Sequence, residues 1–213
     1  MLPFCTITPS RGDRPELLEF CKHQLSRMTI KPDKSYFIDH KAHDDKPDLT
    51  MRVRMGVEAA RADGFNTCYI IEDDDYYPPN FFENFWLDED YDFVGSVKTL
   101  YYNIKNQTWR EQYHRLRSSL FQTGFRISAL DQFPWPDNET VFLDLHLWQW
   151  LTSRNGKEHF FNLKQQPQAI GIKHGMGKCL GIGHRIKMEN QDQEWSWLKS
   201  HVDSEAYAFY RSL

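Results

Sequence analysis

The sequence lacks the features of a membrane or secreted protein. Its 213 residues contain no apolar run near the roughly 18 residues that a membrane-spanning helix needs. The first residues, Met1 to Thr6, have neither the charged head nor the apolar body of a signal peptide. No Ser/Gly-rich or Pro-rich linker divides the chain. We therefore expect a single domain that acts in the cytoplasm and has no membrane partner.

Cysteine is scarce, and its four copies are widely spaced at Cys5, Cys21, Cys68 and Cys179. No two of them form a C-x-x-C pair, which argues against a zinc knuckle and against a disulfide framework. Reduced, buried thiols are the expectation. Aromatic residues, in contrast, make up 15% of the chain, and this high fraction indicates that some rings face ligands as well as the core.

The net charge of -4 is small, but the charges are segregated along the chain. The segment from Lys98 to Arg126 contains six cations and a single acid, Glu111. A second segment, from Gly171 to Lys187, contains four cations and no acid. The remaining sequence is therefore acidic, and this segregation indicates a basic face on an acidic body.

Strands and helices alternate over the first 75 residues. Short apolar strands are predicted at Phe4–Thr8, Ser35–Ile38 and Tyr69–Ile71, and residues 15–28 and 50–60 have helical periodicity. This order predicts an α/β fold with a mostly parallel, Rossmann-like central sheet flanked by helices. Ligands are expected along the edge where the strands end. Later strands are predicted at 92–100, 120–127, 159–163 and 169–172, and helices at 141–151 and after 191.

The most informative stretch is the third strand, because it runs directly into Glu72, Asp73, Asp74 and Asp75. Adjacent carboxylates repel one another, and a divalent cation at the strand end would relieve that repulsion. The D-x-D spacing of Asp73 and Asp75 lets one acid bind Mn²⁺ or Mg²⁺ while another takes a ribose hydroxyl or a metal-bound water. The alternative is a solvated acidic turn that Pro78 and Pro79 help to form.

A glycine-rich basic segment, 171–185, holds 5 of the 11 glycines. Glycine lets backbone N–H groups approach phosphates closely. In this segment His174 is a candidate metal ligand, and Lys178 and Arg185 are candidates to hold a diphosphate. An ordinary surface loop is the alternative, because the segment contains no strict phosphate-loop pattern.

Asp144 lies in the apolar segment 141–151, where His146 and Gln149 are the only other polar residues. A carboxyl group with so much apolar surface around it should have a raised pKa unless it is paired, which suits a general base. The alternative is an acid that caps or bonds a neighbouring loop.

Two further groups of residues could bind a nucleotide or a nucleic acid. Arg11 and Arg14 follow the first strand and Asp39 follows the second, so all three belong to one predicted sheet edge. The basic segment 98–126 alternates cations with aromatic rings. Binding of a nucleic acid requires both, because cations contact phosphates and rings stack on unstacked bases. The candidate residues of this segment for binding a nucleic acid, or another acceptor of a transferred group, are Tyr101, Tyr102, Trp109, Arg110, Arg115 and Arg117. A solvated basic hairpin is the alternative.

Taken in order, these pieces resemble a nucleotide-sugar glycosyltransferase of the GT-A fold, close to the inverting family 2 type. The likeness includes Ile7–Arg11, Glu72–Asp75, Gln122–Phe125, Leu143–Trp148 and the late His174. It implies a nucleotide-binding half of about 1–95 and an acceptor half of about 96–213. By the resemblance, a UDP-sugar would contact Thr8, Pro9, Arg11, Arg14, Asp39, Asp73, Asp74, Lys178 and Arg185.

The resemblance also implies that Asp73, Asp75 and His174 hold Mn²⁺ or Mg²⁺ and that Asp144 is the base. The family usually has Glu-Asp at that place, whereas this chain has Leu143 before Asp144. In gross organisation the chain is similar to phage enzymes that glycosylate hydroxymethylated pyrimidines in DNA, which makes 5-hydroxymethylcytosine an expected acceptor. The alternatives are a sugar-1-phosphate nucleotidyltransferase and a non-catalytic nucleic-acid-binding module.

Overall fold

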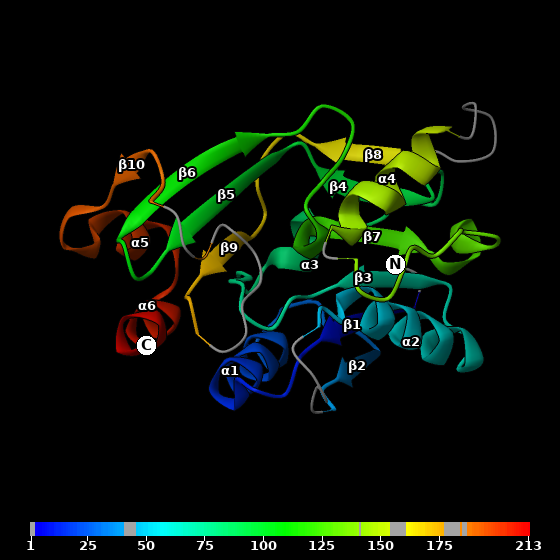
Figure 1. Cartoon of the computed structure of the whole chain (residues 1–213), viewed down its shortest axis with the longest axis horizontal. Coiled ribbons are helices and arrows are strands. Elements are labelled where there is room, and N and C mark those ends of the chain that lie inside the picture. Colours follow the sequence, from blue (N-terminus) through cyan, green and yellow to red (C-terminus); the bar gives the residue numbers. More distant parts are fainter. Residues whose placement is uncertain (1–2, 41–45, 141, 154–160, 177–183, 185–186) are drawn as a thin grey trace.

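The computed structural model describes residues 3–40, 46–140, 142–153, 161–176, 184 and 187–213 (Figure 1). Two sheets organise these residues. The central sheet contains, in spatial order, β2 (Lys34–Ile38), β1 (Phe4–Pro9), β3 (Thr67–Ile70), β7 (Thr123–Arg126), β4 (Phe93–Ser96) and β8 (Phe161–Lys164). The second sheet contains β10 (Asn190–Gln191), β6 (Thr108–Tyr113), β5 (Lys98–Asn103) and β9 (Ile170–Lys173).

The α/β class predicted from the sequence is confirmed, and the central sheet is mixed. Strands β1, β2 and β3 are parallel, as are β4 and β8, but β7 lies antiparallel between β3 and β4. Parallel neighbours need a long crossover, which is usually a helix. The segment between β4 and β7 forms the β5–β6 hairpin instead, so β7 enters the sheet antiparallel. Both expected halves of the chain contribute strands to this sheet.

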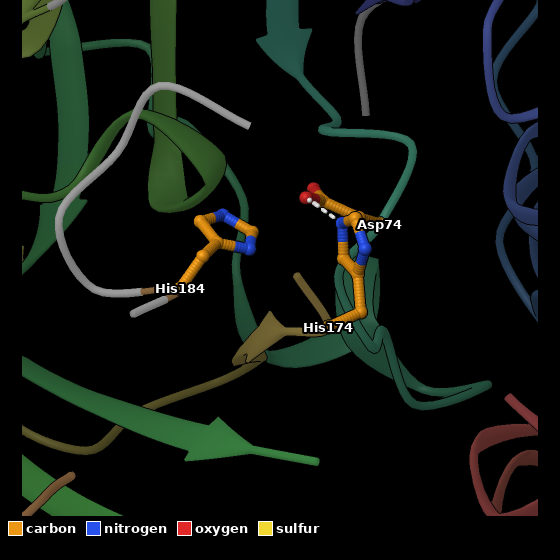
Figure 2. A group of neighbouring side chains, drawn as sticks. All are labelled: Asp74, His174 and His184. Atoms are coloured by element: carbon orange, nitrogen blue, oxygen red, sulfur yellow. Dashed lines mark hydrogen bonds and ion pairs between the residues drawn. The ribbon is translucent and has the colours of Figure 1, made fainter. Parts of the chain in front are cut away.

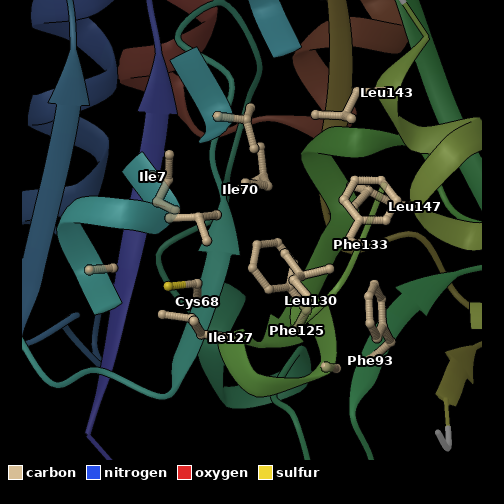
Figure 3. Close-up of a cluster of buried hydrophobic side chains, with 14 of the residues drawn as sticks. Ile7, Cys68, Ile70, Phe93, Phe125, Ile127, Leu130, Phe133, Leu143 and Leu147 are labelled. Atoms are coloured by element: carbon tan, nitrogen blue, oxygen red, sulfur yellow. The ribbon is translucent and has the colours of Figure 1, made fainter. Parts of the chain in front are cut away.

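Helices cover both faces of the central sheet. They are α1 (Pro15–Ser26), α2 (Leu49–Ala62), α3 (Phe81–Asn84) and α4 (Leu143–Ser153). Near the C-terminus, α5 (Ser196–His201) and α6 (Ser204–Ser212) pack with the second sheet instead. Because side chains alternate across a strand, neighbouring residues enter different cores. Ile70 packs with α2 and α4, whereas Tyr69 packs with α1 and α3. Figure 3 shows the first of these cores.

The predicted strand at 92–100 is wrong as one strand, because its two parts belong to different sheets. Residues 93–96 form β4 of the central sheet, and residues 98–103 form β5 of the second sheet. The chain changes sheet at Val97, which donates its backbone N–H to Lys164 and accepts from His114. This switch places the β5–β6 hairpin beside the edge where β1 and β3 end (Figure 1).

A third core joins the second sheet to the C-terminal helices. Trp197 stacks on Tyr102 and Trp109, with ring centroids 5.6 and 4.8 Å apart. Phe20 of α1 stacks on Phe209 of α6 at 3.9 Å. Three of the expected buried thiols, Cys5, Cys21 and Cys68, are free and buried, and Cys179 lies outside the described residues. Among the helices described, none is both long and apolar enough to cross a membrane.

Candidate functional site

A cleft of about 340 Å³ lies between the end of β3, the β5–β6 hairpin, the start of α4 and the end of β9. Its volume falls within the range of small-molecule sites. The charged and aromatic groups that line it include Glu72, Asp74, Tyr101, Arg110, Asp144 and Lys173. The acidic motif, the predicted base and part of the basic aromatic segment, which are far apart in sequence, therefore meet in one place.

The acidic motif divides its side chains between the cleft and the protein interior. Glu72 and Asp74 line the cleft. Asp73 accepts hydrogen bonds from Ser10 Oγ at 2.6 Å and Arg14 Nη2 at 2.9 Å. Asp75 is fully buried, and its Oδ1 accepts from the Ile172 backbone N–H at 2.7 Å. The residues that face the cleft are thus spaced two apart, but shifted by one from the predicted pair of Asp73 and Asp75.

Asp74, His174 and His184 form a cluster that could hold a metal ion (Figure 2). One ligand atom from each lies within 4.8 Å of the others. His174 Nε2 is 2.9 Å from Asp74 Oδ2. Its Nδ1 accepts from the Met176 backbone N–H, which places the ring proton of a neutral His174 on Nε2. His184 Nδ1 accepts from the Gly175 backbone N–H at 3.3 Å.

The donor set of this cluster fits a divalent transition metal better than Mg²⁺. One carboxylate and two imidazoles suit Mn²⁺ or a softer ion, whereas Mg²⁺ prefers oxygen ligands alone. The ring N–H of His174 now points at Asp74, so coordination through Nε2 would move the ring proton to Nδ1. The bond from Met176 to Nδ1 would then be lost. Binding of a metal through Nε2 would therefore be coupled to the backbone at Met176, just after β9.

Arg14 is one of two cations, with Lys173, whose charges oppose those of the acidic motif. Its guanidinium contacts Asp73 Oδ1 at 2.9 Å, Asp74 Oδ2 at 3.2 Å and His174 Nε2 at 3.1 Å. Burial acts to raise the pKa of Asp74, but its hydrogen bond with His174 and the charge of Arg14 outweigh burial and hold the pKa below its usual range. Asp74 is therefore ionised at neutral pH, as a metal ligand must be.

The other titratable groups around the cluster respond to burial and to one another. Burial and the charge of Asp74 raise the pKa of Glu72 to about 7. The same two causes raise the pKa of Asp75 well above its usual range, and the buried Oδ2 of this carboxyl has no hydrogen-bond partner among the described residues. Burial, with the charge of Lys173, lowers the pKa of His184 to about 3. His184 is consequently neutral near pH 7 and able to bind a metal.

Asp144 lies in the first turn of α4 and borders the cleft. It forms an ion pair with Arg117, which follows the β5–β6 hairpin. Burial raises the pKa of Asp144, and the charge of Arg117 opposes this effect. The side chain is partly buried, as the apolar surroundings in the sequence predicted, and it is paired.

The β5–β6 hairpin presents one face to the cleft and the other to the C-terminal helices. Tyr101, Arg110 and Arg117 line the cleft. Tyr102 is fully buried on the opposite face, where its hydroxyl donates to Asp192, and Trp109 stacks there on Trp197. The predicted acceptor roles of Tyr102 and Trp109 are therefore corrected to packing roles, because alternate residues of a strand face opposite sides. Arg115 is exposed.

The residues expected to contact a nucleotide lie at or near the edge where β1 and β2 end. Thr8 is fully buried, and Pro9 closes β1. Arg11 donates to the Lys46 carbonyl and pairs with Asp48 at 3.1 Å. Asp39 is exposed directly after β2. The remaining two predicted residues, Lys178 and Arg185, lie outside the described residues.

The sequence analysis did not select Glu72, His184 or Lys173 as site residues. A signal for His184 was present, because it shares the glycine-rich basic segment with His174. Lys173 directly precedes His174 at the end of β9, and it lines the cleft close to Tyr101, with its Nζ 5.3 Å from the ring centroid. Glu72 could be recognised only once the direction of each acidic side chain was known.

Comparison with protein-family models and with curated proteins finds no match. Comparison with solved structures finds 55 similar chains. One of them is the crystal structure of residues 1–349 of S. aureus TarS, with a TM-score of 0.47 and 9% sequence identity. The likeness covers 81% of this chain and 61% of that chain, so this protein spans about three fifths of that length.

Proposed function

We propose that this protein is a metal-dependent glycosyltransferase that moves a sugar from a UDP-sugar to an acceptor hydroxyl. The observation that carries the proposal is the shared cleft, in which Asp74 and His184 of the metal cluster occur together with the partly buried carboxyl of Asp144. A cation-binding cluster and a carboxylate base are the two groups that sugar transfer from a diphosphate needs.

In this proposal Asp74, His174 and His184 hold the ion, and Mn²⁺ fits their donor set. An ion held by these residues would supply Lewis-acid charge for the diphosphate leaving group. Arg14 and Lys173 add positive charge beside the same acids. Glu72 borders the cleft two residues before Asp74, where it can accept a hydrogen bond from a ribose hydroxyl.

Asp144 is the proposed general base. Its carboxylate takes the proton of the acceptor hydroxyl while that oxygen attacks the anomeric carbon and the bond from this carbon to the diphosphate oxygen breaks. Attack on the face opposite the leaving group inverts the anomeric configuration. Arg117 keeps Asp144 ionised while burial raises its pKa, so the base is charged but weakly solvated.

For the acceptor we propose a hydroxymethylated pyrimidine of DNA, 5-hydroxymethylcytosine being the first candidate. Support comes from the sequence resemblance and from the positions of Tyr101, Arg110 and Arg117, all three of which line the cleft. A base inside a duplex would have to leave the stack to reach a cleft of this kind.

Mass spectrometry tests donor and acceptor together. Hydroxymethylated DNA is incubated with a panel of sugar nucleotides and Mn²⁺, with and without EDTA. A mass gain of one hexose or pentose that EDTA abolishes is the expected result. Release of pyrophosphate from a nucleoside triphosphate and a sugar 1-phosphate would instead favour a nucleotidyltransferase. Salt-sensitive DNA binding without any turnover of sugar nucleotides would favour a binding module.

A further inference from the structure

Strand β6 turns a row of polar side chains toward the cleft. Arg110 and Gln112, which are two residues apart, both line it, as does His114 just beyond the strand. Arg110 lies directly opposite Tyr101 in the β5–β6 register, with its guanidinium carbon 5.3 Å from the Tyr101 ring centroid. This cross-strand contact fixes the guanidinium on the cleft side of the hairpin.

Arg110 differs from the other cations of the cleft in having no acidic partner. Arg117 pairs with Asp144, and Lys173 lies close to the acidic motif, whose charges raise its pKa against the effect of burial. Within the described ranges, no carboxylate lies within 4.0 Å of Arg110. Its Nη2 donates to Gln112 Oε1 at 3.0 Å, and its buried Nε has no hydrogen-bond partner.

The surroundings of His114 indicate a positive potential at this end of the cleft. Burial, followed by the charges of Arg117 and Arg110, lowers the pKa of His114 to about 4. The imidazole is therefore neutral near pH 7, and its Nε2 forms a hydrogen bond with Ser119 Oγ at 3.2 Å. An oxyanion beside Arg110 would offset this positive potential and give the unpaired guanidinium a partner.

We infer that Arg110 binds an anionic group of the acceptor, a phosphate or a carboxylate, while the donor nucleotide is in place. The inference rests on the proposed function, because that function assigns the donor diphosphate to the metal cluster and places Arg110 on the acceptor side of the cleft without saying which acceptor group it contacts. Arginine presents a planar pair of N–H donors that matches two oxygens of a phosphate or carboxylate. The acceptor is thus an alcohol that carries a negative charge near its reacting hydroxyl.

Sulfate binding to the full chain tests this inference. Calorimetric titrations are run with saturating Mn²⁺ and UDP, so that the proposed donor site is filled. We expect sulfate to bind the wild-type protein and to bind Arg110→Gln at least tenfold more weakly. Arg211→Gln is the matched control, because Arg211 is an exposed arginine of α6 that does not line the cleft, and its loss should leave sulfate binding unchanged. Arg110→Lys keeps the positive charge but lacks the planar pair of N–H donors, so it should bind sulfate with an intermediate affinity.

The inference is overturned if Arg110→Gln, folded by its thermal transition, binds sulfate like the wild type. Displacement of sulfate by UDP would also overturn it, because Arg110 would then belong to the donor site. UDP affinity with and without Mn²⁺ is measured on the same samples, so loss of the proposed function is detected separately. Competition by glycerol phosphate and by a short single-stranded oligonucleotide then distinguishes a small phosphorylated acceptor from a nucleic acid.

Discussion

Asp144 and Arg117 form an ion pair at the cleft, and this pair sets the charge of the proposed base. Burial raises the pKa of Asp144 and the neighbouring guanidinium opposes that change, so the carboxylate stays available for proton transfer near neutral pH. Arg110, in contrast, has no carboxylate within 4.0 Å in the part of the chain that the structure describes. The chemistry of the cleft therefore depends on which cation is paired with which acid.

Asp144→Asn should slow sugar transfer by about 10²- to 10⁴-fold, because the amide cannot accept the acceptor proton. Binding of UDP and Mn²⁺ should stay close to wild type, since Asp144 is not a member of the metal cluster. Initial rates and UDP titrations measure the two effects, and a thermal melt shows whether the unpaired Arg117 alters the fold. Undiminished turnover would remove Asp144 as the base.

His114 gives a pH dependence whose sign can be stated. Burial and the nearby arginines lower its pKa from 6.5 to about 4, so the unfolded chain gains this proton first as the pH falls. The contribution of His114 to the free energy of unfolding is therefore present above pH 6.5 and lost as the pH falls through 4. Relative to His114→Asn, the wild type should lose about 1–3 kcal/mol over this range in urea unfolding experiments. A difference independent of pH would contradict this.

The sequence predicted site roles for the acidic motif, Asp144 and His174, but it did not predict the direction of each acidic side chain. Residues 72–75 form a turn, in which the Asp75 backbone N–H donates to the Glu72 carbonyl at 3.4 Å, and nothing in four consecutive acids marks which of them is buried. The hydrogen bond from the Ile172 backbone N–H holds the Asp75 side chain in the interior, and this contact joins residues 97 positions apart. Such a tertiary contact leaves no local pattern in the sequence.

At the scale of elements, one face of the β5–β6 hairpin lines the cleft and the other face packs against the C-terminal helices. Tyr101 and Arg110 face the cleft, whereas the next pair in the register, Tyr102 and Trp109, faces Trp197. The sequence predicted a basic aromatic segment and treated its rings alike. Only pairing with β9 and contact with the C-terminal helices determine which rings are exposed to a ligand.

Gly171 of β9 makes room for the Tyr101 ring. A Cβ at Gly171 would lie 2.5 Å from Tyr101 Cδ1, so Gly171→Ala must displace the ring or the strand. We expect a loss of about 1–3 kcal/mol in the free energy of unfolding, as for other overpacked sites. In Tyr101→Ala, which removes the clash, the added alanine should cost clearly less. Strictly additive losses in the double-mutant cycle would show that the ring is not what Gly171 accommodates.

At the scale of the whole molecule, the cleft forms where two sheets meet. The α/β class and the end of β3 as a site were predictable, because alternating strands and helices are local patterns. The second sheet was not predicted, since β5 pairs with β9 about 70 residues later in the chain, Leu100 opposite Ile170. Long-range pairing of this kind depends on how the intervening chain folds.

Asp192 ties the C-terminal helices to the second sheet, and its loss should weaken the whole fold. The carboxylate is buried and accepts from Tyr102 Oη and the Trp197 backbone N–H, both at 2.7 Å. Asp192→Ala leaves these donors unsatisfied and should lower the free energy of unfolding by about 2–3 kcal/mol in urea. The neighbouring exposed Gln193 serves as control, and Gln193→Ala should have little effect. Equal stabilities of the two variants would contradict the account.

Mn²⁺ binding by Asp74→Asn and Asp75→Asn, followed by electron paramagnetic resonance in the presence of UDP, tests the central claim most directly. Both changes are nearly isosteric, and asparagine at position 75 keeps an oxygen that can accept from Ile172. The account predicts that Asp74→Asn loses Mn²⁺ binding and that Asp75→Asn retains it, because among the described residues Asp74, and not Asp75, joins His174 and His184 in the cluster. Retention by Asp74→Asn, or loss by a folded Asp75→Asn alone, would contradict the assignment of the metal to this cluster.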